Sequence, residues 1–198
     1  MTRWARWVMA VLAAAALGGC TQNTRPLNFS LPDVSPAQVR QNAELKTVSM
    51  STAVPGEAAG KIAALTDITV PAWKVALEDA IDRSAIFLDD SPRKLSLVVK
   101  ITQFDAPTVG FDKNTTATAR YEVIDRATRA TLFISDVTST GHVPAGFAFA
   151  GAERSWESIN RAIRSNIQQF LQQLGSADLS KPVFPPGAAP PAAAKPSS

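Results

Sequence analysis

Few side chains in this 198-residue chain are suited to covalent or acid–base chemistry. The chain has one cysteine, Cys20, and one histidine, His142. Cys20 ends the stretch Leu17-Gly18-Gly19-Cys20, whose small glycines would let the backbone lie extended in a peptidase cleft. The thiol of Cys20 is a nucleophile that could be modified covalently. What precedes this stretch indicates which modification to expect, and we predict below that Cys20 is lipidated.

The segment before Cys20 has the layout of a secretory signal. It starts with Arg3 and Arg6 and continues in an apolar, uncharged run from Trp7 to Leu17. That run is too short to span a bilayer comfortably, because a transmembrane helix needs roughly 20 apolar residues. With its four closing residues it resembles the lipobox of bacterial lipoproteins and predicts a signal peptide over residues 1–19. An uncleaved signal anchor and an ordinary signal peptide with a chance cysteine are the alternatives.

The residues after Cys20 predict where the lipid would hold the chain. They are Thr21-Gln22-Asn23, with no aspartate beside the cysteine. In lipoproteins of Gram-negative bacteria this implies release from the inner membrane and sorting to the outer one. Stable anchoring takes more than one acyl chain, and a mature lipoprotein carries three. We expect the periplasmic face of the outer membrane, with the membrane as one partner through the lipid on Cys20.

Composition limits the other partners and the source of stability. The formal net charge of +3 includes both arginines of the signal, so the mature chain would be nearly neutral. A nucleic-acid binder would show a clustered basic excess, and we expect no nucleic-acid partner. Because the lone cysteine would be consumed by lipid, no disulfide is expected and stability must come from an apolar core.

Two proline-rich ends predict a single central domain. Pro26, Pro32 and Pro36 punctuate a polar segment that we interpret as a flexible tether over residues 20–43, although residues 34–45 could hold a short helical turn. Residues 177–198 are rich in proline, alanine, glycine and serine and predict a disordered tail, with contact to peptidoglycan or a partner as the alternative. The folded domain would cover residues 44–176.

Hydrophobic periodicity predicts six elements in this domain. A weak alternation over residues 45–52 indicates a strand, and residues 57–65 stay unassigned. The remaining predictions are a helix over 71–84 with Pro71 in its first turn, strands over 94–104, 117–124 and 131–139, and a long helix over 153–174 closed by Gly175. The link of residues 125–129 is short enough for an antiparallel hairpin.

The resulting order, β-α-β-β-β-α, predicts an α+β fold. We expect a two-layer sandwich with an antiparallel or mixed sheet and both helices on one face. The apolar stripe of the last helix, which includes Trp156, Ile163 and Phe170, would be the face that covers the sheet.

No constellation in the chain predicts catalysis, a metal site or a cofactor. His142 stands beside Gly141 and Pro144, and we interpret it as a surface loop residue, because no nucleophile or orienting carboxylate is predicted to meet it. A zinc site would lack its usual second histidine or cysteine. The carboxylates near the end of the first helix are interpreted as turn and capping groups rather than as an acid–base pair or calcium loop: Asp79, Asp82, Asp89 and Asp90.

The segment from Ala145 to Gly151 is the one loop that suggests a contact role. Phe147 and Phe149 are flanked by glycines. They could close over the sheet as core residues, which we expect, or form an exposed apolar patch for a partner or lipid.

Taken together, the pattern resembles small Gram-negative envelope lipoproteins, the auxiliary lipoprotein components of ABC-type transport systems. The features that carry the resemblance are the motif ending in Cys20, the 71–84 helix, the 94–104 strand, the hairpin around residues 125–129 and the glycine-containing loop before the 153–174 helix. It implies a non-catalytic accessory or scaffold that binds an envelope protein and supports transport or assembly. Two other hypotheses stay open, a carrier of lipid or another small apolar ligand and, third, an enzyme.

Overall fold

The computed structural model describes residues 27–106 and 109–184, so Cys20 and its motif lie outside the described residues. Its elements in chain order are β1 (Glu44–Thr52), α2 (Thr66–Ser84), β2 (Lys94–Asp105), β3 (Lys113–Asp125), β4 (Thr131–Val143), the 3-10 turn η2 (Ala145–Phe147) and α3 (Gly151–Gly175). The predicted β-α-β-β-β-α order is confirmed. Among these residues, no helix combines the length and apolarity needed to cross a bilayer.

The strands form one mixed sheet in the order β1-β2-β3-β4. β1 and β2 are parallel, because α2 carries the chain back between them. The pairs β2–β3 and β3–β4 are antiparallel, which confirms the predicted hairpin. Of the two kinds of sheet left open by the sequence, the mixed one is correct.

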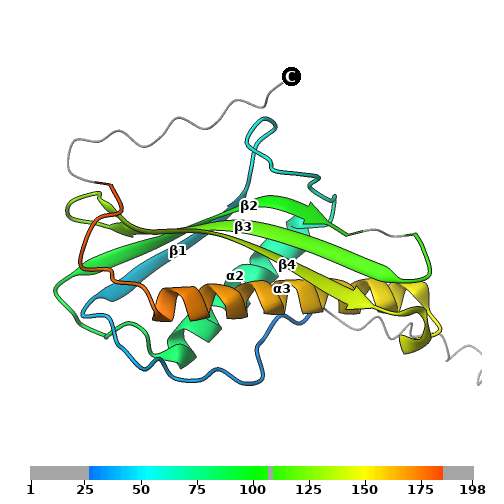
Figure 1. The fold of residues 1–198 in the computed structure, drawn as a ribbon, viewed down its shortest axis with the longest axis horizontal. Coiled ribbons are helices and arrows are strands. Elements are labelled where there is room, and N and C mark those ends of the chain that lie inside the picture. The colour runs from blue at the N-terminus through cyan, green and yellow to red at the C-terminus, as the bar shows by residue number, and fades with distance from the viewer. Residues whose placement is uncertain (1–26, 107–108, 185–198) are drawn as a thin grey trace, which may run out of the picture.

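Both helices lie on the same face of the sheet, as Figure 1 shows. Leu95, Leu97 and Val99 alternate toward that face and are buried, whereas the residues between them are partly exposed on the other face. On the next strand the ring of Tyr121 stacks on Phe170 of α3, with 4.0 Å between ring centroids. The α+β two-layer prediction is therefore confirmed.

A polar cluster fixes α3 on the two antiparallel strands. Asn166 is fully buried, and its amide nitrogen donates to the carbonyl oxygens of Ala117 (3.2 Å) and Val137 (2.9 Å) and to Oγ of Ser139 (3.0 Å). Its Oδ1 accepts from the hydroxyl of Tyr121 at 2.8 Å. Burial raises the pKa of that hydroxyl, so it stays protonated and donates. Every polar group of the Asn166 side chain is thus paired inside the core.

Two local predictions differ from the structure, and the stretch left unassigned takes a defined place in it. α2 begins at Thr66, so Pro71 lies inside the helix rather than in its first turn. Pro71 is exposed, and the carbonyl of Asp67 that its missing N–H leaves free can face water. β4 continues through Gly141 and His142, which were predicted to lie in a loop. The unassigned residues 57–65 run partly beside β2, where Ile62 and Phe104 form a parallel bridge.

The packed part of the chain is longer than the predicted domain of residues 44–176. Residues 27–43, predicted to be a tether, lie against the helices as a segment that we name the strap. Phe29 is 2% exposed and Leu31 6%, so both belong to the core. At the other end Leu179 is 1% exposed, and the backbone N–H of Val183 donates to the carbonyl of Thr131 at 2.8 Å. The rest of the predicted tail, residues 185–198, lies outside the described residues.

Candidate functional site

The strap shows where the chain that leads to Cys20 enters the domain. The backbone N–H of Asn28 donates to Oδ1 of Asn160 at 3.0 Å, near the middle of α3. Further along, the side-chain amide of Gln41 donates to the carbonyl of Ala177 at 3.0 Å, just after α3 ends. The strap therefore runs in the same direction as α3. Followed backwards from Asn28, the described chain points toward the N-terminal end of α3.

The strap is held to both helices. The guanidinium of Arg83, at the end of α2, donates to the carbonyl oxygens of Leu31 (2.7 Å) and Pro32 (3.0 Å). The backbone N–H of Ala37 donates to the carbonyl of Ser84 at 2.8 Å. These bonds and the burial of Phe29 make the strap a fixed part of the fold.

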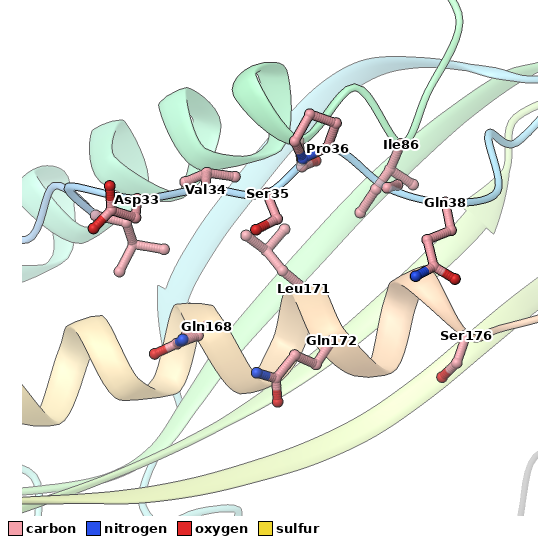
Figure 2. Close-up of a pocket in the computed structure, with 14 residues that line it drawn as sticks. Asp33, Val34, Ser35, Pro36, Gln38, Ile86, Gln168, Leu171, Gln172 and Ser176 are labelled. Carbon is pink, nitrogen blue, oxygen red and sulfur yellow. The ribbon is translucent and has the colours of Figure 1, made fainter.

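A cleft of about 430 Å³ lies between the strap and the C-terminal half of α3. Figure 2 shows Asp33 to Gln38 on one side and Gln168, Leu171 and Gln172 on the other. The lining is mixed, with amides and a carboxylate beside apolar side chains. A purely apolar ligand would leave these polar groups without partners there, so the cleft gives the carrier hypothesis little support.

The predicted contact loop lies at the end of the molecule where α3 begins. Phe149 is fully exposed and Phe147 is 38% exposed, so the expectation that they close over the core is wrong. The loop between β2 and β3 reaches the same end, because β2 ends and β3 begins there. It exposes Val109 (81%) and Phe111 (85%). We name these four residues the aromatic end.

Arg154 joins the two loops of the aromatic end. Its side chain is nearly buried and donates to the carbonyl oxygens of Phe111 (3.1 Å), Ala148 and Phe149 (3.0 Å). In addition, the backbone N–H of Ala145 donates to the carboxylate of Asp112 at 2.9 Å. The guanidinium of Arg161 lies over the ring of Phe147, 5.1 Å from its centroid. Hydrogen bonds from Arg154 therefore join the described parts of the two loops that carry the exposed rings.

A small apolar cleft of about 300 Å³ opens near the same end. It lies between the beginning of α3, the end of β2 and the residue that precedes α2, and its lining includes Trp156, Ile159, Leu65 and Ala106. Its volume is at the lower limit of common ligand sites. It is the described cavity whose lining best suits an apolar group.

The remaining candidates are not brought together into a reactive site. His142 is exposed on β4, and its Nδ1 lies 2.7 Å from Oδ1 of Asn114 on β3. Asp79 pairs with Arg83 at 3.2 Å. Burial, and then the charges of Glu78, Asp79 and Asp89, raise the pKa of Asp82. Within the described ranges, no group of histidine, cysteine and carboxylate side chains is arranged to hold a metal ion.

Comparison with known proteins gives distant similarities of structure. No protein-family model matches the chain, and no curated protein matches it. A protein of Xanthomonas campestris described with the DUF330 family is 12% identical, with a TM-score of 0.48 over 74% of this chain and 94% of that one. The PelC dodecamer of Paraburkholderia phytofirmans is 13% identical, with a TM-score of 0.44 over 74% of this chain and 96% of that one. A minor lipoprotein of Acinetobacter baumannii is 12% identical, with a TM-score of 0.41 over 66% of this chain and 93% of that one.

Sequence reasoning missed the strap and half of the aromatic end. The strap had a signal, since Leu27, Phe29 and Leu31 alternate with polar residues as a half-buried extended segment does. Phe111 had none, because its neighbours in the sequence show no periodicity that would indicate whether its ring is buried or exposed. Arg154 lies outside the apolar stripe predicted for the last helix, and its role depends on carbonyl groups that only the folded loops bring together.

Proposed function

We propose that this protein is an envelope lipoprotein, acylated on Cys20 and held at the periplasmic face of the outer membrane, whose folded domain serves as a non-catalytic accessory or scaffold. The observation that carries the proposal is the Leu17-Gly18-Gly19-Cys20 motif behind a charged start and an apolar run. The strap adds to it, because packed residues are found as early as Leu27, only seven positions after Cys20. A domain so close to its anchor would act at the membrane surface.

The accessory role, within ABC-type envelope transport or a related assembly, is part of the same proposal and requires an envelope protein partner. Such a partner could bind to the face of the sheet that is turned away from the helices. It could also bind to the end of the domain where β3 ends and β4 begins, opposite the first turn of α3. On that strand face Arg120 and Asp136 form a two-bond pair at 2.8 Å each. Crosslinking in intact cells followed by purification of the lipidated protein would identify the partner.

Metabolic labelling with a palmitate analogue tests the anchor. The wild-type chain should incorporate the label and fractionate with outer membranes, and Cys20→Ser should do neither. Thr21→Ser is the matched control, because it changes the neighbouring residue while leaving the thiol in place. Labelling that persists in the Cys20→Ser chain would refute the proposal.

A lipid carrier is the second candidate function, and the observation that favours it is the apolar cleft beside Trp156. Native mass spectrometry of protein released in mild detergent distinguishes the two. Ala152 also lines this cleft. One co-purifying lipid per chain, lost when Ala152→Trp fills the cleft, would support the carrier. An empty protein that retains its envelope partner would support the scaffold.

A further inference from the structure

We infer that the aromatic end is a membrane-docking surface, which inserts Phe149, Phe111 and their neighbours into the lipid leaflet that holds the Cys20 acyl chains. The inference rests on the proposed acylation of Cys20 and specifies how the domain stands on the membrane. Its occupant is the lipid surface itself, rather than a second copy of the chain or a protein partner.

The aromatic end has the composition of an interfacial insertion. Phe149, Phe111 and Val109 are each more than four-fifths exposed. One exposed apolar side chain on a protein surface is common and needs no explanation. Here two separate loops bring them to one end. The only charged residue in the sequence of either loop, residues 106–112 and 144–150, is Asp112, which accepts a hydrogen bond from Ala145. The tips can therefore enter a lipid interface without transferring an unpaired charge.

The strap places the anchor at the same end. Asn28 contacts Asn160, nine residues after α3 begins, which corresponds to about 14 Å along the helix axis at 1.5 Å per residue. From Leu27 to Cys20 there are seven residues, which can span at most about 25 Å. That reach exceeds the 14 Å to the aromatic end. Because the described strap already points toward this end, the acyl chains can enter the leaflet beside the phenylalanines.

The opposite end of the domain lies away from the direction in which the described strap points. The described C-terminal segment leaves beside Thr131, at the hairpin end of the sheet, where β3 ends and β4 begins. Figure 1 shows this end and the start of α3 at the two extremes of the long axis. Docking through the aromatic end would therefore stand the domain upright, with its hairpin end pointing into the periplasm.

Hydrogen bonds from one side chain of α3 preform the described part of this surface. Arg154 fixes the carbonyl groups of Phe111 and Phe149 relative to each other. A preformed surface avoids the ordering cost that a mobile loop would have on entering the lipid. Because its tips are apolar and nearly uncharged, insertion should respond weakly to salt and to the fraction of anionic lipid.

Spin-label accessibility in the acylated full-length protein tests the inference. The chain has no other cysteine, so once Cys20 is acylated a nitroxide can be attached at one introduced thiol. Gly146→Cys places it within the aromatic end, where an added Cβ meets nothing within 4 Å. Ala127→Cys places it in the exposed hairpin turn at the other end. Both proteins are reconstituted in vesicles of phosphatidylethanolamine with a minority of phosphatidylglycerol.

At position 146 the label should collide more often with oxygen than with a water-soluble nickel chelate, and at position 127 the order should be reversed. Adding Phe147→Ser and Phe149→Ser should raise nickel access at position 146 to the value at position 127. Transfer of one buried phenylalanine side chain corresponds to about tenfold or more in partitioning. In wild-type loops, free nickel access at position 146 would overturn the inference, as would shielding from both reagents, which indicates a protein contact.

The state of Cys20 in the same samples separates this inference from the proposed function. Acylated Cys20 with a water-exposed label at position 146 would overturn the docking surface alone. Unmodified Cys20, found by mass spectrometry of the N-terminal peptide, would overturn the proposed function and the docking inference with it.

Discussion

Gly141 marks the closest approach of α3 to β4, and replacing it with alanine should destabilise the fold strongly. A Cβ built at this position would lie 2.0 Å from the carbonyl oxygen of Ser158 and 2.5 Å from the backbone nitrogen of Ala162. Ordinary contacts of a Cβ begin at about 3.4 Å. The helix would have to move away by more than an ångström, because the obstructing atoms belong to its backbone and cannot rotate aside.

The magnitude follows from what surrounds the contact. Overpacking a well-filled core usually costs about 1–3 kcal/mol and occasionally more. Displacing α3 would also strain the bond from Oγ of Ser139 to the carbonyl of Ala162 (2.9 Å) and the one between Thr115 and Ser158 (2.8 Å). We therefore expect Gly141→Ala to lower the free energy of unfolding by about 3 kcal/mol or more, a large part of the 5–15 kcal/mol typical of a domain.

Urea unfolding of the Cys20→Ser chain lacking residues 1–19, followed by the fluorescence of its two tryptophans, Trp73 and Trp156, measures the effect. Gly146→Ala is the matched control, since its Cβ meets nothing within 4 Å. It should be neutral or stabilising by up to about 1 kcal/mol, because alanine restricts the unfolded chain. If the two variants differ by less than about 1 kcal/mol, the close approach of α3 to β4 is refuted.

Three further predictions concern the stability of the fold, the first two measured by the same urea unfolding and the third by thermal unfolding. Asn166→Ala should lower the free energy of unfolding by about 2–4 kcal/mol, because it leaves the Tyr121 hydroxyl and strand carbonyls without a buried partner. A loss below about 1 kcal/mol would contradict the hydrogen bonds described for Asn166. Burial opposes ionisation of Asp125, but Arg93 and two backbone N–H groups outweigh it and lower its pKa. A lowered folded-state pKa stabilises the protein above the ordinary value near 4, and that stabilisation is lost as the pH falls through the lower folded value. Asp125→Asn should therefore make the free energy of unfolding fall less steeply below pH 4. The same fall in both proteins would contradict the lowered pKa of Asp125. Phe149→Ser should change the melting temperature by no more than an exposed control such as Val183→Ser, and a large loss would show that the ring is packed.

The fold could be predicted because its strongest signals are local. The alternation in β2 and the three- and four-residue spacing of α3 reflect burial against a single layer, and each element follows its own periodicity. The hairpin needed only a short polar link. The parallel pairing of β1 could not be predicted in this way, because partner and direction depend on α2 returning the chain to the same edge.

The wrong predictions concern residues whose type is compatible with two different structural positions. Pro71 favours a first turn, yet it is tolerated in α2 because it faces solvent, where the unpaired carbonyl can be hydrated. Gly141 suggests the end of a strand, but here it allows a helix to pack closely on one. Phe149 suggests core, and only the fold shows that the loop's backbone is turned so that the ring has nothing to cover it.

The strap changes how the proposed anchor would act. A flexible tether over residues 20–43 would let the domain move some 75 Å from the membrane, at about 3.3 Å for each of 23 residues. With Phe29 and Leu31 buried, only the seven residues before the strap remain to span the distance, or about 25 Å. The beginning of α3, toward which the described strap points, would then stay near the lipid whether or not the phenylalanines of the aromatic end insert. A periplasmic partner would therefore meet the hairpin end or the outer strand face, and crosslinks from Ala127 should be found more often than crosslinks from Gly146.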